Sequence, residues 1–467
     1  MNRDLIVQIA YLVSSILFIL GIRSLTHPDT ARRGMQLAAL GMLVAIVGTL
    51  FLYQVVSYQW IAAGLIVGSL IGYPLGMWVP MTAMPERIAI SHTFGSLAAA
   101  LVGIAEYYNL YHYGPSPHGA THLQMVALGL EVLFGSLTVT GSFMACGKLQ
   151  GFITERSVTY PFQNHTNIAM FAVAIGMLIY VIVVPGAQTV FYGMVALAAA
   201  LGVLMVLPIG GADMPVVLSL LNSYTGLAAA ATGFAIGNYV LIITGALDGA
   251  SGFILSVVMS KAMNRSFTNV IFGAFGSGEA AAGAIRSAEG LTVHPIAIED
   301  AAMQLAYARE VIIVPGYGMA VAQCQHQVRE LTDLIERRGG QVKFAIHPVA
   351  GRMPGHMNVL LAEVDIPYAR LYGMDDINGE FPQADVALVI GANDVVNPAA
   401  KDEPGSPIYG MPILNVDEAK SIIVLKRGMS HGFAGIENDL FYRDKTFMLF
   451  GDAKDSLGKL VSEIKTM

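Results

Sequence analysis

The chain has 467 residues and a formal net charge of −7 at pH 7; 55% of its residues are hydrophobic and only 13% are charged. Soluble domains carry about a quarter charged residues, so this composition excludes a single soluble domain. The acidic balance argues against nucleic acid as a partner. Charged residues are sparse up to residue 260 and ordinary afterwards, which predicts a membrane part followed by a soluble C-terminal domain.

Nine apolar segments are long enough, or nearly so, to cross a bilayer, which takes about 20 residues each. The first has no small-residue cleavage site, so we interpret it as a retained helix rather than a signal peptide. The expected spans are Leu5–Ile22, Gly34–Tyr53, Trp60–Val79, Ile88–Ala105, Leu123–Ala145, Ile168–Val184, Val190–Leu207, Pro215–Ile236 and Tyr239–Met259.

Positive charges alternate between the connections of these spans. The alternate loops, including 109–121, lack Lys and Arg. By the positive-inside rule, nine spans place the N-terminus outside and the C-terminal domain in the cytoplasm. The cations that carry this prediction are Arg23, Arg32, Arg33, Arg87, Lys148, Arg156, Lys261 and Arg265.

Several spans are rich in small residues, for example Gly226–Gly233 and Gly245–Gly252. Small residues allow helix backbones to approach closely in lipid, so this pattern predicts a tightly packed bundle. Residues 266–292 are rich in Gly and Ala with little periodicity, which is typical of a linker. We therefore predict a transmembrane domain over 1–265, a hinge over 266–292 and a cytoplasmic domain over 293–467.

The C-terminal domain opens with the stretch Val311-Ile-Ile-Val-Pro-Gly-Tyr-Gly318. A β-branched strand ends at a glycine turn, and the following residues have a helical pattern through Ile335. Free N–H groups at such a turn form a seat for a pyrophosphate, with Gly316 and Gly318 allowing close approach. Val321 replaces the third glycine of the dinucleotide motif, so an ordinary strand–helix turn is the alternative.

Further strand-like runs alternate with helical ones. This alternation predicts a Rossmann-like, doubly wound α/β domain with a parallel sheet, closed by a helix over Ala453–Lys465. The expected strands are Gln341–Ile346, Ala369–Met374, Val386–Gly391, Pro412–Val416, Ser421–Lys426 and Thr446–Phe450.

Five polar side chains lie within or beside the predicted spans, where such groups are costly and usually functional. His92 is the residue type that binds and releases a proton near neutral pH; a neutral histidine bonded to a helix carbonyl is the alternative. Asn222 would hold water or orient an imidazole, or join two helices. Asp213 precedes the eighth span as a proton exit group or a helix cap. Glu131 and Asp248 have no partner that the sequence identifies.

The second predicted strand ends at His347 without the carboxylate that binds the ribose hydroxyls of NAD. Lys426 and Arg427 end a later strand, and two adjacent cations suit a ribose 2′-phosphate. This favours NADP(H) over NAD(H), the alternative being a solvated basic pair. No metal site is predicted, because His347 and His356 flank a glycine-rich loop without further ligands, and the lone Cys146 and Cys324 form no cluster.

Long strings of this sequence resemble the β subunit of bacterial proton-translocating NAD(P) transhydrogenase over essentially the whole chain. They are Ile209-Gly-Gly-Ala-Asp-Met-Pro-Val-Val217, Leu221-Asn-Ser-Tyr224, Lys261-Ala-Met-Asn-Arg-Ser266, Pro315-Gly-Tyr-Gly-Met-Ala-Val-Ala-Gln323, His347-Pro-Val-Ala-Gly-Arg-Met-Pro-Gly-His-Met-Asn358, Gly391-Ala-Asn-Asp394 and Leu449-Phe-Gly-Asp-Ala-Lys454.

The resemblance implies hydride transfer between NADH and NADP⁺, coupled to inward proton movement and producing NADPH. It implies a multi-pass protein of the bacterial inner membrane that binds NADP(H) itself. A separate α subunit would bind NAD(H) and add membrane helices, in a dimer of αβ units. His92 and Asn222 match proton-path positions, and Asp213 matches the interface with the nucleotide domain.

The resemblance also implies an NADP(H) site, with the dinucleotide reversed relative to an ordinary Rossmann fold. Lys426 and Arg427 would take the 2′-phosphate, and the loop through Phe433 would form a lid. The expected contacts are Gly316, Tyr317, Gly318, Val349, Ala350, Gly351, Arg352, Met353, Pro354, Gly391, Ala392, Asn393, Asp394, Val395, Gly410, Met411, Lys426, Arg427, Gly428, Met429, Ser430, His431, Gly432, Phe433, Asp452 and Ala453.

The chain departs from the family pattern at three places. Asp248 stands where an apolar or small residue is expected, Phe433 where tyrosine is frequent, and Glu131 differs in placement. Two other functions fit the composition: a transporter or channel gated by a dinucleotide-sensing cytoplasmic domain, and a membrane-anchored NADPH reductase. The second would need a flavin or metal site, for which the sequence has no motif.

Overall fold

The computed structural model describes residues 3–51, 57–112, 121–154, 157–184, 186–211, 213–264, 267, 292–406 and 408–467. The predicted hinge at 266–292 lies outside them, apart from its residues 267 and 292, and so do Arg156 and Arg265. The chain separates into two compact units. One comprises Met1–Ile209 and Val217–Ser256, and the other Gly210–Val216 and Val257–Met467.

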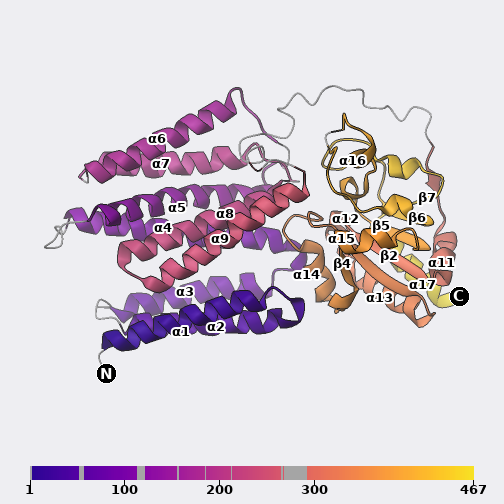
Figure 1. Ribbon diagram of the computed structural model, residues 1–467, viewed down its shortest axis with the longest axis horizontal. Coiled ribbons are helices and arrows are strands. Elements are labelled where there is room, and N and C mark those ends of the chain that lie inside the picture. Colours follow the sequence, from indigo (N-terminus) through magenta and orange to yellow (C-terminus); the bar gives the residue numbers. More distant parts are fainter. Residues whose placement is uncertain are drawn as a thin grey trace. The chain divides into compact units, whose positions relative to one another are not determined.

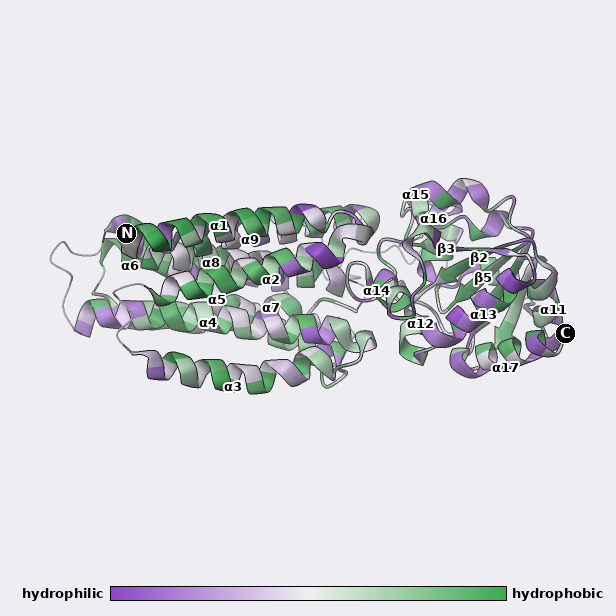
Figure 2. Cartoon of the chain, turned by 90° about the horizontal axis from the view of Figure 1, so that it is seen from below, coloured by the Kyte–Doolittle hydropathy of each residue, from purple (hydrophilic) through white to green (hydrophobic). Residues whose placement is uncertain are grey.

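The described part of the first unit is a bundle of long apolar helices (Figure 1). Nine helices among the described residues are long and apolar enough to cross a membrane, each coinciding with one predicted span. In Figure 2 hydrophobic residues predominate along them. They are α1 (Arg3–Ser24), α2 (Pro28–Leu50), α3 (Tyr58–Met77), α4 (Met84–His112), α5 (His122–Leu149), α6 (Gln163–Val183), α7 (Gln188–Val206), α8 (Met214–Ile236) and α9 (Tyr239–Ala262).

Glycines allow helix backbones to come into contact in this bundle. A Cβ atom on Gly202 of α7 would lie 2.1 Å from the Leu137 carbonyl oxygen of α5. A Cβ atom on Gly226 of α8 would lie 2.3 Å from the Gly249 nitrogen of α9. Because lipid provides no hydrophobic drive between helices, such backbone contact is a main source of packing energy. The predicted role of the small residues is confirmed.

The second unit contains a seven-stranded sheet among the described residues, in the order β1-β7-β6-β5-β2-β3-β4. Each of its strand pairs is parallel, so the predicted Rossmann-like, doubly wound class is confirmed. The strands are β1 (His294–Pro295), β2 (Glu310–Pro315), β3 (Gln341–Ile346), β4 (Leu371–Gly373), β5 (Val386–Ile390), β6 (Ser421–Lys426) and β7 (Thr446–Phe450).

Apolar runs explain the centre of this sheet, since β2, β5 and β6 are buried along nearly their whole length. Continuous burial is what helices on both faces of a parallel sheet require. The helices are α11 (Ile298–Tyr307), α12 (Tyr317–Ala322), α13 (Gln325–Arg337), α14 (His356–Glu363), α15 (Met374–Ile377), α16 (Ala399–Asp402) and α17 (Ala453–Thr466), with short 3₁₀ turns between several elements.

The predicted strand over Pro412–Val416 is wrong. Its backbone groups are satisfied by loops instead of a ladder: Leu414 N–H donates to the Val395 carbonyl at 3.0 Å, and Asn378 Nδ2 donates to the Ile413 carbonyl at 3.0 Å. Ile413 and Leu414 are buried. The segment is therefore apolar because it fills the core, which periodicity alone does not separate from a strand.

The single helix predicted through Ile335 is also wrong, because it is divided into α12 and α13. Gln323 adopts a left-handed backbone, with φ of 50°, and ends α12. The Val328 N–H then donates to the Cys324 carbonyl to start α13. The two-residue strand β1 was not predicted, because His294 and Pro295 show no strand pattern.

Candidate functional site

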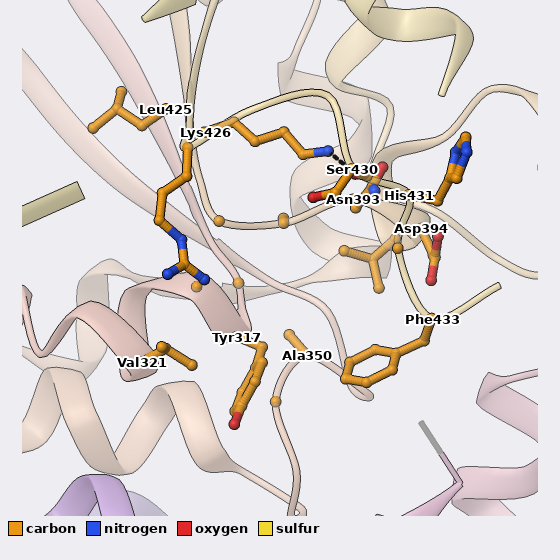
Figure 3. A pocket seen from close by; sticks show the side chains of 18 of the residues that line it. Tyr317, Val321, Ala350, Asn393, Asp394, Leu425, Lys426, Ser430, His431 and Phe433 are labelled. Carbon is orange, nitrogen blue, oxygen red and sulfur yellow. Dashed lines mark hydrogen bonds between the residues drawn. The ribbon is translucent and has the colours of Figure 1, made fainter. Parts of the chain in front are cut away.

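A cavity of about 520 Å³ lies at the carboxyl ends of the central strands. The chain order reverses between β2 and β5: β3 and β4 lie on one side of β2, and β6 and β7 beyond β5. Ligands of doubly wound sheets bind at such a switch point. The cavity is lined by the turns after β2, β5, β6 and β7 and by residues 349–351, and Figure 3 shows its side chains.

Most of the expected contact residues are brought together here. Those lining the cavity are Gly316, Tyr317, Gly318, Val349, Ala350, Gly351, Gly391, Ala392, Asn393, Asp394, Val395, Met411, Lys426, Arg427, Gly428, Ser430, His431, Gly432, Phe433, Asp452 and Ala453. Arg352, Met353, Pro354, Gly410 and Met429 do not line it.

Sequence reasoning missed several lining residues, among them Val321, Leu425 and Gly451. Two simple signals point to them. Val321 lies one helical turn after Tyr317 on the same helix. Leu425 and Gly451 are adjacent to predicted contact residues at the carboxyl ends of two parallel strands.

The glycines after β2 and β5 bring two turns into backbone contact. Gly316 N–H donates to the Ile390 carbonyl at 2.9 Å, and Gly318 N–H donates to the Gly391 carbonyl at 3.0 Å. A Cβ atom on Gly318 would lie 2.6 Å from Gly391 Cα. Gly391 also has φ of +65°, a conformation that favours glycine. The N–H groups of Gly316 and Gly318 therefore join the two turns and are not among the free N–H groups that the sequence predicts for an anion.

The Tyr317 and Phe433 rings form another wall of the cavity. The Arg352 guanidinium lies 4.3 Å from the centroid of the Tyr317 ring, although only 6% of Arg352 is exposed. The Phe433 ring lies 6.2 Å from that of Tyr317, inclined by 45°. Figure 3 shows Tyr317, Ala350 and Phe433 at the same end of the cavity. Arg352 therefore contacts the Tyr317 ring without lining the cavity itself.

Two buried histidines hold the loop from 347 to 356. Val349 N–H donates to His347 Nδ1 at 3.2 Å, and Arg352 N–H donates to His356 Nδ1 at 3.1 Å. His347 Nε2 lies 2.8 Å from the Pro412 carbonyl oxygen. An imidazole whose Nδ1 accepts a hydrogen bond is neutral. Burial lowers the pKa of His347 to about 4, and burial followed by the Arg352 charge lowers the pKa of His356 to about 4.

The loop 427–435 is fastened to the floor of the cavity by Asp394. Ala434 N–H donates to Asp394 Oδ2 at 3.0 Å. A Cβ atom on Gly432 would lie 2.3 Å from Asp394 Oδ1, so glycine allows the loop to pass over the carboxylate. Burial raises the pKa of Asp394, and the backbone N–H groups of 434 and 433 oppose this. The carboxyl group thus serves as an anchor for the loop.

The two cations at the end of β6 differ in their surroundings. Lys426 Nζ donates to the Ser430 carbonyl (Figure 3) and lies 5.0 Å from the Phe441 ring centroid. Burial lowers the pKa of Lys426. Arg427 is exposed and lines the cavity. Arg427 is therefore the better placed of the two to meet a solvated anion.

The bundle holds its own polar cluster. His92 of α4 is half-buried and lies beside Asn222 of α8, one helical turn from the 2.8 Å contact between Ser96 Oγ and Thr225 Oγ1. The buried His92 Nδ1 atom has no hydrogen-bond partner among the described residues. Asn222 Nδ2 donates to Asp248 Oδ1 of α9 at 3.1 Å. Glu131 of α5 is fully buried, and its Oε1 accepts from Thr232 Oγ1 at 2.7 Å.

Asp213 lies directly before α8 and is 2% exposed, and its carbonyl accepts from Val216 N–H at 3.1 Å. Asp213 belongs to the second compact unit, whereas His92 and Asn222 belong to the first.

These features define an integral membrane protein with a Rossmann-like domain whose cavity lies at the switch point of the sheet. Residues 7–463 match the model of a family described as "NAD(P) transhydrogenase beta subunit". Two Rhodospirillum rubrum proteins named "NAD(P) transhydrogenase subunit beta", one from strain ATCC 11170, are each 48% identical over 453 residues, 97% of either chain. The chain therefore belongs to the NAD(P) transhydrogenase beta-subunit family, a family of oxidoreductases.

Replacing Gly432 by alanine should release the loop 427–435 from Asp394, because the added Cβ would clash with a carboxylate held by Ala434. The Ala434 amide should then exchange its hydrogen about tenfold faster or more. This factor corresponds to the free energy of one hydrogen bond to a charged acceptor. Gly428→Ala is the matched control, since nothing lies within 4 Å of its added Cβ. Equal Ala434 protection in both variants would contradict this role.

The buried histidines should make the second unit sensitive to acid. Their folded pKa of about 4 lies below the unfolded value of about 6.5. Between these values the unfolded chain binds protons that the folded chain excludes, so the free energy of unfolding decreases as pH falls. The loss is about 1.4 kcal/mol per pH unit for each histidine.

His356→Asn keeps an acceptor for Arg352 N–H and removes one titration, so it should have a shallower pH slope. Urea midpoints from pulse proteolysis at several pH values between about 7 and about 5 measure the slope. An unchanged slope would show that His356 is not buried in its neutral form.

Proposed function

We propose that this chain is the NADP(H)-binding, proton-conducting subunit of a transhydrogenase. In this proposal it exchanges hydride between NADH and NADP⁺ while protons move inward across the bacterial inner membrane, favouring NADPH. The N-terminus would lie outside and the second unit in the cytoplasm. The observation that carries the proposal is the cation pair Lys426-Arg427, which lines the same cavity as the turns after β2 and β5.

The residues present fit a dinucleotide phosphate. The cavity volume of about 520 Å³ falls in the range of small-molecule sites. Arg427 offers a forked guanidinium for a phosphate, Tyr317 and Phe433 offer ring faces, and Asn393 and Asp394 offer polar groups. NADP(H), when bound, supplies the nicotinamide that gives or takes the hydride.

The end of β3 supports NADP(H) rather than NAD(H) as the ligand of this chain. A carboxylate there would bind the ribose hydroxyls of NAD. The residue is His347, which is buried and bonded to Val349 N–H and to the Pro412 carbonyl. The "beta subunit" name of the family supports an α subunit as partner, and we propose that this partner binds NAD(H) in a dimer of αβ units.

The bundle would supply the driving force. Two nicotinamides have similar hydride affinities, so an external drive is needed to favour NADPH. One charge moved through the membrane potential gives about 2.3 kcal/mol per 100 mV, which changes a ratio more than tenfold. We propose that His92, beside Asn222, binds and releases the proton. Asp213 and the residues 266–292 would transmit this state to the cavity.

The proton role of His92 is tested with His92→Ala in membranes that contain the complete complex. This variant should keep NADP(H) binding and lose proton-coupled reduction of an NAD analogue by NADPH, and an uncoupler should then have no further effect. Undiminished proton pumping would contradict the proposal. Nucleotide-gated proton flux without hydride exchange would identify a gated channel instead.

The phosphate role of Arg427 is tested with Arg427→Gln, which should weaken NADP⁺ binding about ten- to hundredfold, the scale of a charge-assisted hydrogen bond. Lys426→Gln should have a smaller effect, because its ammonium faces the Ser430 carbonyl. Arg337→Gln, at an exposed position in the last turn of α13, is the control. Calorimetric titration measures the affinity, and equal losses in the Arg427 and Arg337 variants would contradict the assignment.

A further inference from the structure

We propose that Asp248 is a positioning residue for the proton site at His92: its carboxylate orients the Asn222 amide toward the imidazole and adds a negative charge beside it. This inference rests on the proposed function of His92. It concerns a carboxyl group at a position where the family resemblance leads one to expect an apolar or small residue.

Three side chains from three helices form the cluster. Asn222 Nδ2 of α8 donates to Asp248 Oδ1 of α9 at 3.1 Å. On α4, His92 lies beside Asn222, one helical turn from the 2.8 Å contact between Ser96 Oγ and Thr225 Oγ1 that joins α4 to α8. Glycine makes this contact possible, since a Cβ atom on Gly252 of α9 would lie only 3.0 Å from Asn222 Nδ2. The close packing of α8 and α9 therefore places a carboxylate within reach of the amide.

The chemistry of the three groups fixes the direction of the hydrogen bonds. An ionised carboxylate only accepts hydrogen bonds, so Asn222 must turn its NH₂ group toward Asp248. The amide oxygen of Asn222 is then the atom left for His92, and an oxygen accepts from an imidazole N–H. Asp248 thus selects the orientation of Asn222 that stabilises a protonated ring nitrogen.

The cost of the carboxyl group makes a purely structural role unfavourable. Asp248 lies nine residues after the start of α9, roughly 14 Å along its axis. A carboxylate at such depth is costly, and one hydrogen bond to an amide offsets only part of that cost. Asp248 is exposed on this chain. Among the described residues, Asn222 is the one whose side chain donates a hydrogen bond to its carboxylate.

The other titratable groups on α4 and on the helices packed against it have contacts elsewhere or lie on other turns. The Glu131 carboxyl binds Thr232, and Lys148 Nζ donates to the Ile209 carbonyl at 2.8 Å. The remaining groups are Glu86, Arg87, Glu106, Tyr107, Tyr108, Tyr111 and His112 on α4, His122 and Cys146 on α5, Tyr224 on α8, and Tyr239 and Lys261 on α9. Asp248 is the carboxylate that contacts the His92–Asn222 pair among the described residues.

The test compares the pH profiles of proton-coupled hydride transfer for Asp248→Asn and Asp248→Val in proteoliposomes of the complete complex. Without the carboxylate, the protonated His92 loses a neighbouring opposite charge. The pH profile should therefore move to lower pH by about one unit, which is the size of the pKa shift that a neighbouring opposite charge causes. Asp248→Glu should restore the wild-type profile. Ser251→Ala on the same helix removes a hydroxyl bonded to its own Leu247 carbonyl and should change nothing.

A merely structural role would lower the rate at every pH without moving the profile, and that result would overturn the inference. So would a profile shift in Ser251→Ala equal to that in Asp248→Val. Uncoupled hydride exchange in the same preparations verifies that Asp248→Asn, a near-isosteric change, is folded. If His92→Ala abolishes pumping while the Asp248 profiles stay unmoved, only this inference fails; if His92→Ala still pumps, the proposed function fails.

Discussion

Backbone contact between the turns after β2 and β5 is the constraint on which the cavity depends. Gly316, Gly318 and Gly391 leave no room for side chains where the two turns meet, and each turn donates or accepts the hydrogen bonds that hold the other. Because this contact occurs where the strand order reverses, it fixes the floor of the cavity at the switch point. The loop 427–435 then crosses this floor, tethered to Asp394.

In the bundle, two carboxyl groups have hydrogen-bond partners on neighbouring helices. Glu131 has Thr232, and Asp248 has Asn222, which also reaches His92. Glycine contacts between α8 and α9 bring Asn222 and Asp248 within hydrogen-bonding distance. The glycines that let α8 and α9 pack closely therefore also allow the hydrogen bond between Asn222 and Asp248. In the same way, glycines at the switch point of the sheet allow the hydrogen bonds between the turns after β2 and β5.

Composition and periodicity were sufficient for the architecture. Long apolar segments predicted the spans, and buried β-branched runs predicted β2, β3, β5, β6 and β7, because burial on both faces of a sheet needs continuous apolar sequence. The same reasoning failed at Pro412–Val416, which is equally apolar but is bonded to loops. It also failed at Gln323, where a left-handed residue that no sequence signal marks divides one helix into two.

The site was only partly predictable, for a physical reason. Residue types indicated which groups carry charge or allow close approach, but not the atoms they meet. Free N–H groups of the turn after β2 were expected to face an anion, yet those of Gly316 and Gly318 bond to the neighbouring turn. Lys426 and Arg427 look equivalent in sequence, whereas one contacts the Ser430 carbonyl and the other is exposed. Such differences arise from contacts between residues distant in sequence.

The central claim is that the cavity between the turns after β2 and β5 binds NADP(H). Hydrogen exchange of the full chain with and without NADP⁺ or NAD⁺ tests it most directly. NADP⁺ should protect the amides of 391–395 and 427–435, and NAD⁺ at the same concentration should protect them far less. Equal protection by both nucleotides, or protection confined to other segments, would contradict it.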